Sequence, residues 1–359
     1  MCPSQPIYFG TYTKRSSRGI YACEFSLSEG KLGAPRLVAE TPDPSFLALH
    51  PGRKILYAAN ELRTYSGRDT GTVSAFRIGI GEDAWESAGR CETDGASPCH
   101  LAVAGTENSL IATNYRGASV ACIALRDQGE LTDRLDLHLH AGQSVDPVRQ
   151  ASPHPHSVHV DPVRRRVWVA DLGIDQLVPY RIAPTAGRLA LDPVGAISLP
   201  PGTGPRQLAF HPGGRHFFLL GELNASLTVF QMETIAGAPR AGECVSIVGD
   251  DCTEMSAAEV AVHPSGRFVY ASNRGVGSIA VFDFAAASGR LTRRSQVGTG
   301  GKLPRHFALS PDGKWLVVAN QDNDVVRVFS VGPDTGALEV ASECAIPEPT
   351  CVIWGDSRP

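Results

Sequence analysis

No stretch of the sequence approaches the roughly 20 consecutive apolar residues that a membrane-spanning helix needs. The N-terminus, MCPSQPIYFGTYT, lacks the basic start and apolar core of a secretory signal. The formal net charge is only −4, so bulk electrostatic binding to nucleic acid or to a membrane is not expected. These absences predict a cytoplasmic protein, in which any anion site must come from a local group of arginines.

Two kinds of reactive-site motif are also missing. None of the nine cysteines forms a C-x-x-C pair, and their number is odd, so we expect small buried thiols in a reducing compartment rather than disulfides or a zinc site. The chain contains no G-x-S-x-G motif, and no candidate Ser/His/Asp set emerges. Covalent catalysis through a serine is therefore not expected.

What the sequence does contain is one pattern that recurs about every fifty residues. Each copy has an opening residue pair, an apolar stretch, a turn with Pro or Gly, and a second apolar stretch that ends on a polar residue. Alternation and enrichment in β-branched and aromatic residues mark each copy as a β-hairpin. Complete copies begin at Pro44, Pro98, Pro155, Pro205, Ala257 and Pro304.

A seventh first strand begins at Pro349, where the chain runs out, and its partner begins at Pro6. A third strand and a more polar fourth strand follow most hairpins, which is the composition of a propeller blade. We therefore predict an all-β fold, a single seven-bladed β-propeller domain over residues 1–359. One blade combines strands from both ends of the chain and closes the ring.

Antiparallel pairing places the start of each first strand beside the end of each second strand, at one mouth of the central channel. The column after the opening residue reads Ser45, Cys99, His156, Arg206, Ala258, Arg305 and Thr350. The column at the end of the second strand reads Tyr12, Glu61, Tyr115, Leu172, Glu222, Arg274 and Gln321.

Three arginines from successive blades, Arg206, Arg274 and Arg305, should thus converge at this mouth, and Arg149 would add a fourth from a nearby loop. Glu222 and Glu61 would neutralise them in a purely structural network. Alternatively, a small anionic ligand completes the charge balance. The planar guanidinium fork suits carboxylates and phosphates, which favours the anion site.

The histidines fall into two groups. His50, His211 and His263 precede turn residues at equivalent places in the repeat, so we interpret them as turn or packing residues. His154 and His156 belong to the mouth, with His100 and His306 one column further in. Strand alternation should send His156 and His159 to opposite faces, and no acidic residue completes a ligand set, so no metal is expected.

At these motifs the sequence resembles the seven-bladed lactonases, which include propeller-type 6-phosphogluconolactonases and fungal-type carboxymuconate cyclases. The resemblance runs nearly end to end, and PHPHSV, PRQLAFHP, GELN and SNRG in this order carry it most specifically. The site proposed for the cyclase branch falls on His156, Arg206, Glu222 and Arg274. The chain departs from its relatives at PRQLAF and LLGEL, without losing a charged residue of that site. The resemblance implies no metal and no organic cofactor.

The expected function is hydrolysis of a small anionic sugar lactone, with 6-phosphogluconolactone as the leading candidate. The alternatives are a carboxymuconate cycloisomerase and a non-catalytic propeller that binds a partner on one face. His156 would be the general base, Arg206 or Arg274 would stabilise the oxyanion, and Glu222 would orient an arginine or act as the acid/base itself. The expected substrate-binding residues are Arg305, His306, Arg149, His154 and Glu61.

Overall fold

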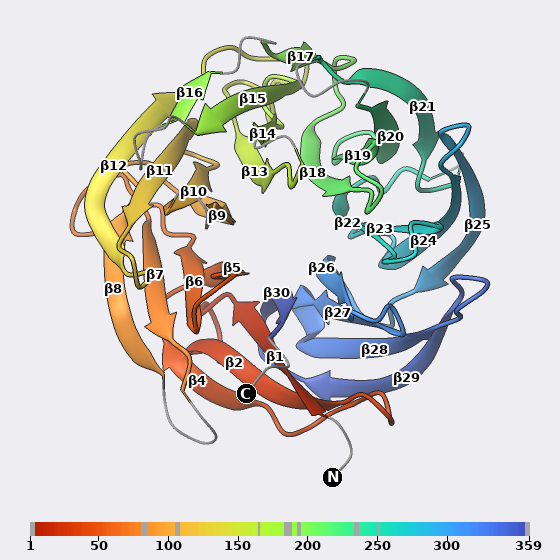
Figure 1. The fold of residues 1–359 in the computed structure, drawn as a ribbon, viewed down its shortest axis with the longest axis horizontal. Coiled ribbons are helices and arrows are strands. Elements are labelled where there is room, and N and C mark those ends of the chain that lie inside the picture. The colour runs from red at the N-terminus through yellow and green to blue at the C-terminus, as the bar shows by residue number, and fades with distance from the viewer. Residues whose placement is uncertain are drawn as a thin grey trace.

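The computed structural model describes residues 4–79, 85–104, 108–163, 166–182, 189–191, 195–232, 237–249 and 252–355. In these residues seven antiparallel sheets stand around a central axis, each with its first strand innermost (Figure 1). This arrangement confirms the predicted all-β, seven-bladed propeller.

The blades are numbered from the first complete repeat. Blade 1 holds β5 (Pro44–Leu49), β6 (Ile55–Asn60), β7 (Thr72–Arg77) and β8 (Glu86–Glu92). Blade 2 holds β9 (Pro98–Ala104), β10 (Ser109–Asn114), β11 (Ser119–Leu125) and β12 (Leu131–Leu139). Blade 3 holds β13 (Pro155–Val160), β14 (Arg166–Asp171), β15 (Gln176–Ile182), β16 (Leu189–Leu191) and β17 (Ile197–Ser198). Blade 4 holds β18 (Pro205–Phe210), β19 (His216–Gly221), β20 (Ser226–Gln231) and β21 (Arg240–Ser246).

Blade 5 holds β22 (Ala257–Val262), β23 (Phe268–Asn273), β24 (Ser278–Ala285) and β25 (Arg290–Gly298). Blade 6 holds β26 (Pro304–Leu309), β27 (Trp315–Asn320), β28 (Val325–Val331) and β29 (Leu338–Ala345). Blade 7 is built from both ends of the chain: β30 (Pro349–Trp354), β1 (Ser4–Thr11), β2 (Gly19–Ser26), β3 (Lys31–Leu32) and β4 (Arg36–Glu40). Its register pairs Ile7 with Trp354 and Gly10 with Cys351, which confirms the predicted closure.

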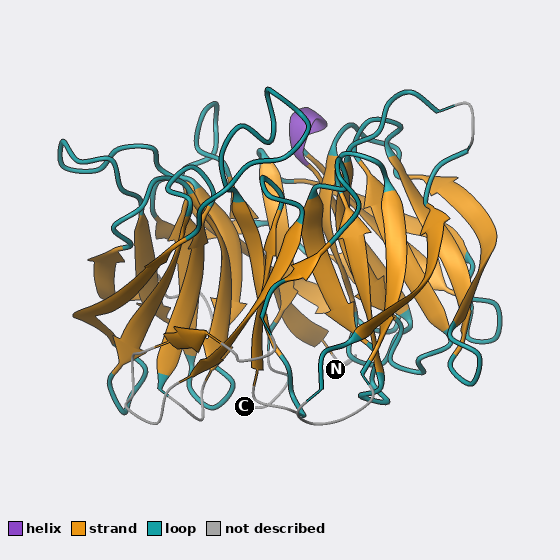
Figure 2. Cartoon of the chain, turned by 90° about the horizontal axis from the view of Figure 1, so that it is seen from above, coloured by secondary structure: helices purple, strands orange, loops and turns teal. Residues whose placement is uncertain are grey.

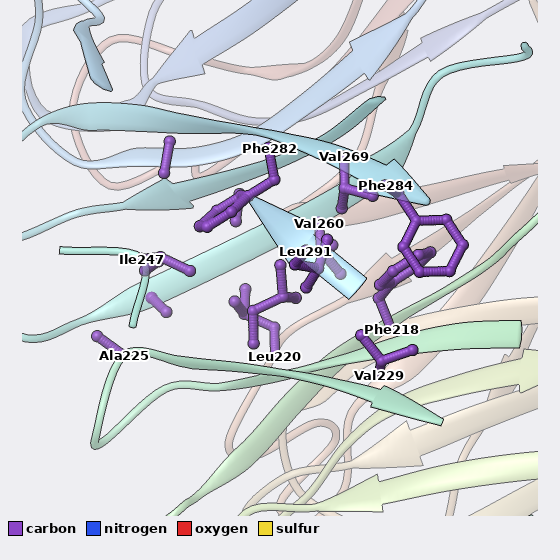
Figure 3. Close-up of a cluster of buried hydrophobic side chains, with 14 of the residues drawn as sticks. Phe218, Leu220, Ala225, Val229, Ile247, Val260, Val269, Phe282, Phe284 and Leu291 are labelled. Atoms are coloured by element: carbon purple, nitrogen blue, oxygen red, sulfur yellow. The ribbon is translucent and has the colours of Figure 1, made fainter. Parts of the chain in front are cut away.

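Apolar side chains hold the ring together between blades. In the described chain, seven apolar clusters occur, and each joins two successive blades. Figure 3 shows the cluster between blades 4 and 5, where Phe218 and Leu220 of β19 meet Val260 of β22 and Phe282 of β24. Five second strands are buried along their whole length because both of their faces pack against neighbouring blades: β6, β10, β14, β19 and β23.

The hairpin turns lie on the face opposite the mouth, and the three turn histidines have the structural role predicted for them. The Nδ1 of His211 accepts a hydrogen bond from Gly213 N at 3.0 Å, and its Nε2 lies 3.1 Å from the carbonyl oxygen of Gly266 in the next blade. His263 makes the same contact with Gly313 O, also at 3.1 Å. Gly266 and Gly313 have φ of 74°, and a Cβ at either would collide with the histidine ring of the preceding blade. Each turn is thus tied to its neighbour.

At the mouth, the residue after each second strand donates its backbone N–H to the carbonyl of the residue before the first strand, as in Glu222 N to Gly204 O at 2.8 Å. Figure 2 marks this face by the short 3-10 helix η2 (Gln321–Asn323), which follows β27. The two columns predicted from the repeat therefore meet at one end of the channel.

The inner strands also contain a feature that alternation did not predict. The register of every inner strand shifts just after its first residue, as between Pro155 and Ser157 in β13. His156 is the extra residue there, and such bulges re-aim a side chain. The two rings nevertheless contact opposite neighbours, as alternation predicts: His156 meets the Tyr115 ring of blade 2, whereas His159 Nε2 lies 2.9 Å from Gln207 Oε1 of blade 4.

Candidate active site

A buried carboxylate from blade 4, Glu222, gathers three arginines at the mouth. Its Oε2 lies 2.9 Å from Arg206 Nε and 2.9 Å from Arg274 Nη2. Its Oε1 lies 2.5 Å from Arg149 Nη2. The structure therefore brings Arg149, Arg206, Glu222 and Arg274 into direct contact, from two blades and one loop. Together with His156 we call these residues the mouth cluster.

The arginines decide the ionisation of Glu222. Burial alone would oppose the charged form, but Arg274, Arg206 and Arg149 outweigh it and lower the pKa of Glu222 to about 2. At neutral pH the side chain is a carboxylate that orients guanidinium groups. It holds no proton to give at neutral pH, so it cannot start a reaction as a general acid.

Arg206 is the most buried of these arginines. Its Nη1 donates a hydrogen bond to the carbonyl of Ala258, on the neighbouring inner strand β22. Burial and the nearby Arg274 lower its pKa to about 10, so the guanidinium still carries its charge at neutral pH. Arg274 is anchored in a similar way, with Nε 3.4 Å from Ser256 O and Nη2 3.4 Å from Ala257 O.

His156 lies among the arginines as a neutral imidazole. Burial first, and then the charges of Arg206, Arg305 and the other arginines, hold its pKa well below the usual value. Its Nδ1 is buried and has no hydrogen-bond partner among the residues that the structure describes. A neutral imidazole can take a proton from a reacting group.

Tyr115 and His154 form the wall beside His156. The Tyr115 and His156 rings meet edge to face, with centroids 5.6 Å apart. The His154 ring stacks on the Tyr115 ring, with centroids 4.4 Å apart, and His154 Nδ1 lies 2.8 Å from the carbonyl oxygen of Tyr115. Tyr115 also accepts a 3.3 Å hydrogen bond from Arg149 through its hydroxyl oxygen. His154 thus supports Tyr115, and its contact with substrate stays a prediction.

A second charged group, the rim cluster, lies across the mouth and consists of Tyr12, Lys14, Glu61 and Arg305. Arg305 Nη2 is 3.5 Å from Glu61 Oε2, which also accepts the Tyr12 hydroxyl at 2.8 Å. The Tyr12 ring has Lys14 Nζ 4.2 Å and Arg305 Cζ 5.3 Å from its centroid. Sequence reasoning found Arg305 and Glu61 but missed Lys14, which follows β1 in a loop outside both columns.

The two clusters leave the mouth positively charged. Three arginines face Glu222 and one faces Glu61, so two positive charges are unmatched even before Lys14 is counted. Arg305 contributes to lowering the pKa of His156, which places it within electrostatic reach of the mouth cluster. Excess buried positive charge is costly unless an anion joins it.

His306, also expected to bind substrate, lies further into the channel. It belongs to a group of five side chains that we call the inner layer: His100, His159, Gln207, Glu259 and His306. Four of them directly follow a mouth residue on their inner strand, and His159 follows His156 by three residues. His306 Nε2 lies 3.5 Å from Glu259 Oε2. Sequence reasoning placed His100 and His306 in this deeper column but missed Gln207 and Glu259, because it followed only the histidines there.

Two properties of the described residues bear on the predicted absences. No group of three or more His, Cys, Asp or Glu side chains in that part of the chain is arranged to hold a metal ion. Within the same residues, no helix has the length and apolar character required to cross a membrane.

Comparison with known proteins gives one consistent match. The family model "Lactonase, 7-bladed beta-propeller" matches residues 6–354. The 6-phosphogluconolactonase of Bacillus subtilis (strain 168) is 32% identical over 347 residues, which cover 96% of this chain and 97% of that protein.

Solved structures agree with this match. The periplasmic gluconolactonase of Pseudomonas aeruginosa superposes with a TM-score of 0.91 at 29% identity, covering 99% of this chain and all of the other. A protein from Lactobacillus plantarum superposes with a TM-score of 0.90 at 30% identity, covering 98% of this chain. By the extent of the family match and by this identity, the chain belongs to the family of seven-bladed β-propeller lactonases.

Proposed function

We propose that the protein is a lactonase that hydrolyses a small anionic sugar lactone, with 6-phosphogluconolactone as its substrate. One observation carries the proposal: neutral His156 lies beside two arginines that Glu222 holds in place, in a mouth with excess positive charge. The names of the relatives support it, since one is a 6-phosphogluconolactonase and another a gluconolactonase.

Each chemical requirement of lactone hydrolysis has a residue in this proposal. His156 accepts a proton from water while the water oxygen bonds to the lactone carbonyl carbon. The carbonyl electron pair moves onto oxygen, where Arg206 and Arg274 donate hydrogen bonds, and each such donor contributes about 3 kcal/mol. The bond from that carbon to the ring oxygen then breaks, and the imidazolium returns its proton to the ring oxygen. The carbonyl re-forms as that bond breaks, and the product is a hydroxycarboxylic acid, which releases its proton to solvent at neutral pH, while His156 is neutral again.

The phosphate is proposed to bind at the rim cluster. Arg305 and Lys14 flank the Tyr12 ring, with Glu61 as their only carboxylate partner among the contacts described here. Arginine binds phosphate oxygens in pairs, and lysine adds a point charge. Arg149, which is 40% exposed, lies at the opening, where it would contact the substrate's polar tail.

A substrate panel tests the function. Purified protein is assayed with 6-phosphogluconolactone, gluconolactone and 3-carboxymuconate, against buffer alone because lactones also open spontaneously. We expect hydrolysis of both lactones above the spontaneous rate, faster with the phosphorylated one. Cyclisation of carboxymuconate without lactone hydrolysis would replace this function by the cycloisomerase alternative. Loss of all three activities would favour a binding module.

The compartment and partners are part of the same proposal. We place the enzyme in the cytoplasm, with a small anion as its partner and without nucleic acid or membrane. The eight cysteines that the structure describes are free, which suits a reducing compartment. Fractionation of cells tests this, because the Pseudomonas relative is periplasmic.

A further inference from the structure

The inner layer contains a buried carboxyl group that the proposed mechanism does not use. The side chain of Glu259 is 8% exposed, and its two oxygens lie 3.0 and 2.9 Å from Gln207 Nε2. The backbone N–H of Val260 donates to Oε1 at 3.2 Å. His306 accepts a 3.3 Å hydrogen bond from Val352 N through Nδ1, so its Nε2 carries the proton and faces Glu259 Oε2 at 3.5 Å.

Glu259 is connected to Arg206 by two neighbouring links between β18 and β22. Arg206 donates to the carbonyl of Ala258, and the next residue along β18, Gln207, donates to the next residue along β22, Glu259. Successive residues of β18 thus supply two side-chain donors, and successive residues of β22 supply the two acceptors. The carboxyl group of Glu259 fixes the segment of β22 whose carbonyl orients the Arg206 guanidinium.

We propose that Glu259 is a positioning residue of the lactonase site: with Gln207 it holds Arg206 in place, and its ionisation puts a negative charge beneath the oxyanion site. The proposal rests on the lactonase function proposed above. It assigns a role to a carboxyl group that touches neither substrate nor the mouth cluster's Glu222.

Burial favours the protonated form of Glu259, and its hydrogen-bond donors favour the charged form. The nearby titratable groups come from five inner strands: Arg206 (β18), His306 (β26) and Cys351 (β30) lie near its carboxyl group, and His100 (β9) and His159 (β13) contact Gln207 beside it. Burial holds the three imidazoles neutral and raises the pKa of the Cys351 thiol, so Arg206 is the one full cation in this set.

Burial also raises the pKa of Glu259 to about 7, against the opposing effects of Gln207 and Arg206. The group therefore titrates in the physiological range. Below this pH it is neutral, and Arg206 is free to stabilise the oxyanion. Above this pH, the Glu259 carboxylate attracts the Arg206 guanidinium, which weakens its interaction with the oxyanion, and repels an anionic substrate. Activity should fall as the pH rises through about 7.

Glu259→Gln is the test, because the amide keeps the shape but cannot ionise. For 6-phosphogluconolactone, wild-type kcat/KM should fall roughly fivefold between pH 7 and pH 8, the change in the protonated fraction of a group with a pKa of about 7. The E259Q profile should stay flat over that interval. Glu243→Gln, the same change on the outer strand β21, should keep the wild-type fall.

A second variant and a second readout keep the outcome decisive. Gln207→Met removes the amide that lowers the pKa of Glu259, so the fall should move to higher pH. The thermal unfolding midpoint of wild type, relative to E259Q, should decrease from pH 4.5 to pH 7, because the folded state holds the proton that the unfolded state releases. The proposal would be overturned if kcat/KM of E259Q still fell between pH 7 and pH 8, or if it were lower than that of wild type by the same factor at every pH. Lactonase inactivity of wild type itself would refute the proposed function instead.

Discussion

At the scale of single residues, the sharpest expectation concerns His156. Replacing it by Ala should lower kcat by roughly two to four orders of magnitude, the range for losing a general base. Because its pKa lies well below the usual value, wild-type activity should not decline between pH 7 and pH 6. Steady-state kinetics of H156A measure this, with thermal unfolding as the control for folding. Near-normal kcat in H156A together with loss in Glu222→Gln would move the acid/base role to Glu222.

Arg305 should distinguish phosphorylated from unphosphorylated substrate. Arg305→Met removes a charged hydrogen-bond donor, so KM for 6-phosphogluconolactone should rise about tenfold to a hundredfold. Gluconolactone, which has no phosphate, should change by less than about threefold in KM. Lys14→Met should show the same selectivity in weaker form because the side chain is exposed. An equal rise in KM for both lactones in R305M would show that the phosphate does not bind at Arg305.

Single residues also mark the limit of what the sequence predicts. The repeat located His156, Arg206, Glu222 and Arg274 because each occupies an equivalent place in its blade. It did not locate Glu259, since the mouth column reads Ala258 in that blade and only histidines were followed one position deeper. The ionisation of these groups depends on burial and on charges from other blades, which no local pattern contains.

At the scale of the element, the bulge of each blade orients a side chain at the mouth, and its hairpin turn lies at the opposite face. The bulge at the start of each inner strand turns one extra side chain toward the mouth. Alternation in the sequence could predict the strands, but it could not predict a bulge, because the extra residue leaves the apolar pattern of the following residues intact.

The turns at the opposite face should contribute to stability and not to catalysis. His263→Ala removes the contacts of Nδ1 with Ser265 and of Nε2 with Gly313 O, each worth roughly 0.5 to 1.5 kcal/mol. We expect the free energy of unfolding to fall by about 1 to 3 kcal/mol, while kcat and KM stay unchanged. Urea denaturation and steady-state kinetics of H263A check both halves. A change in KM would show that the two faces are coupled.

At the scale of the whole molecule, the ring distributes stability over seven interfaces of similar character. Each apolar cluster belongs to two blades, so no blade has a complete core of its own. Gathering charges at the mouth depends on this closure, because the mouth cluster and the rim cluster come from opposite arcs of the ring. The split seventh repeat was enough to predict the closure from the sequence. Its first strand stands alone at the C-terminal end, and the strand that completes the hairpin stands at the N-terminal end.

Deleting residues 349–359 should therefore destabilise the entire domain. The deletion removes β30, whose Cys351 and Val352 are fully buried and which packs between β26 and β5. Two interblade clusters lose members at once, so unfolding should occur at a lower midpoint in one cooperative transition. A circular permutant is the matched control: it opens the exposed turn between residues 333 and 334 and links residue 355 to residue 4. It keeps every blade 7 contact and should unfold near the wild-type midpoint. A truncated protein with an unchanged midpoint would contradict closure by both ends of the chain.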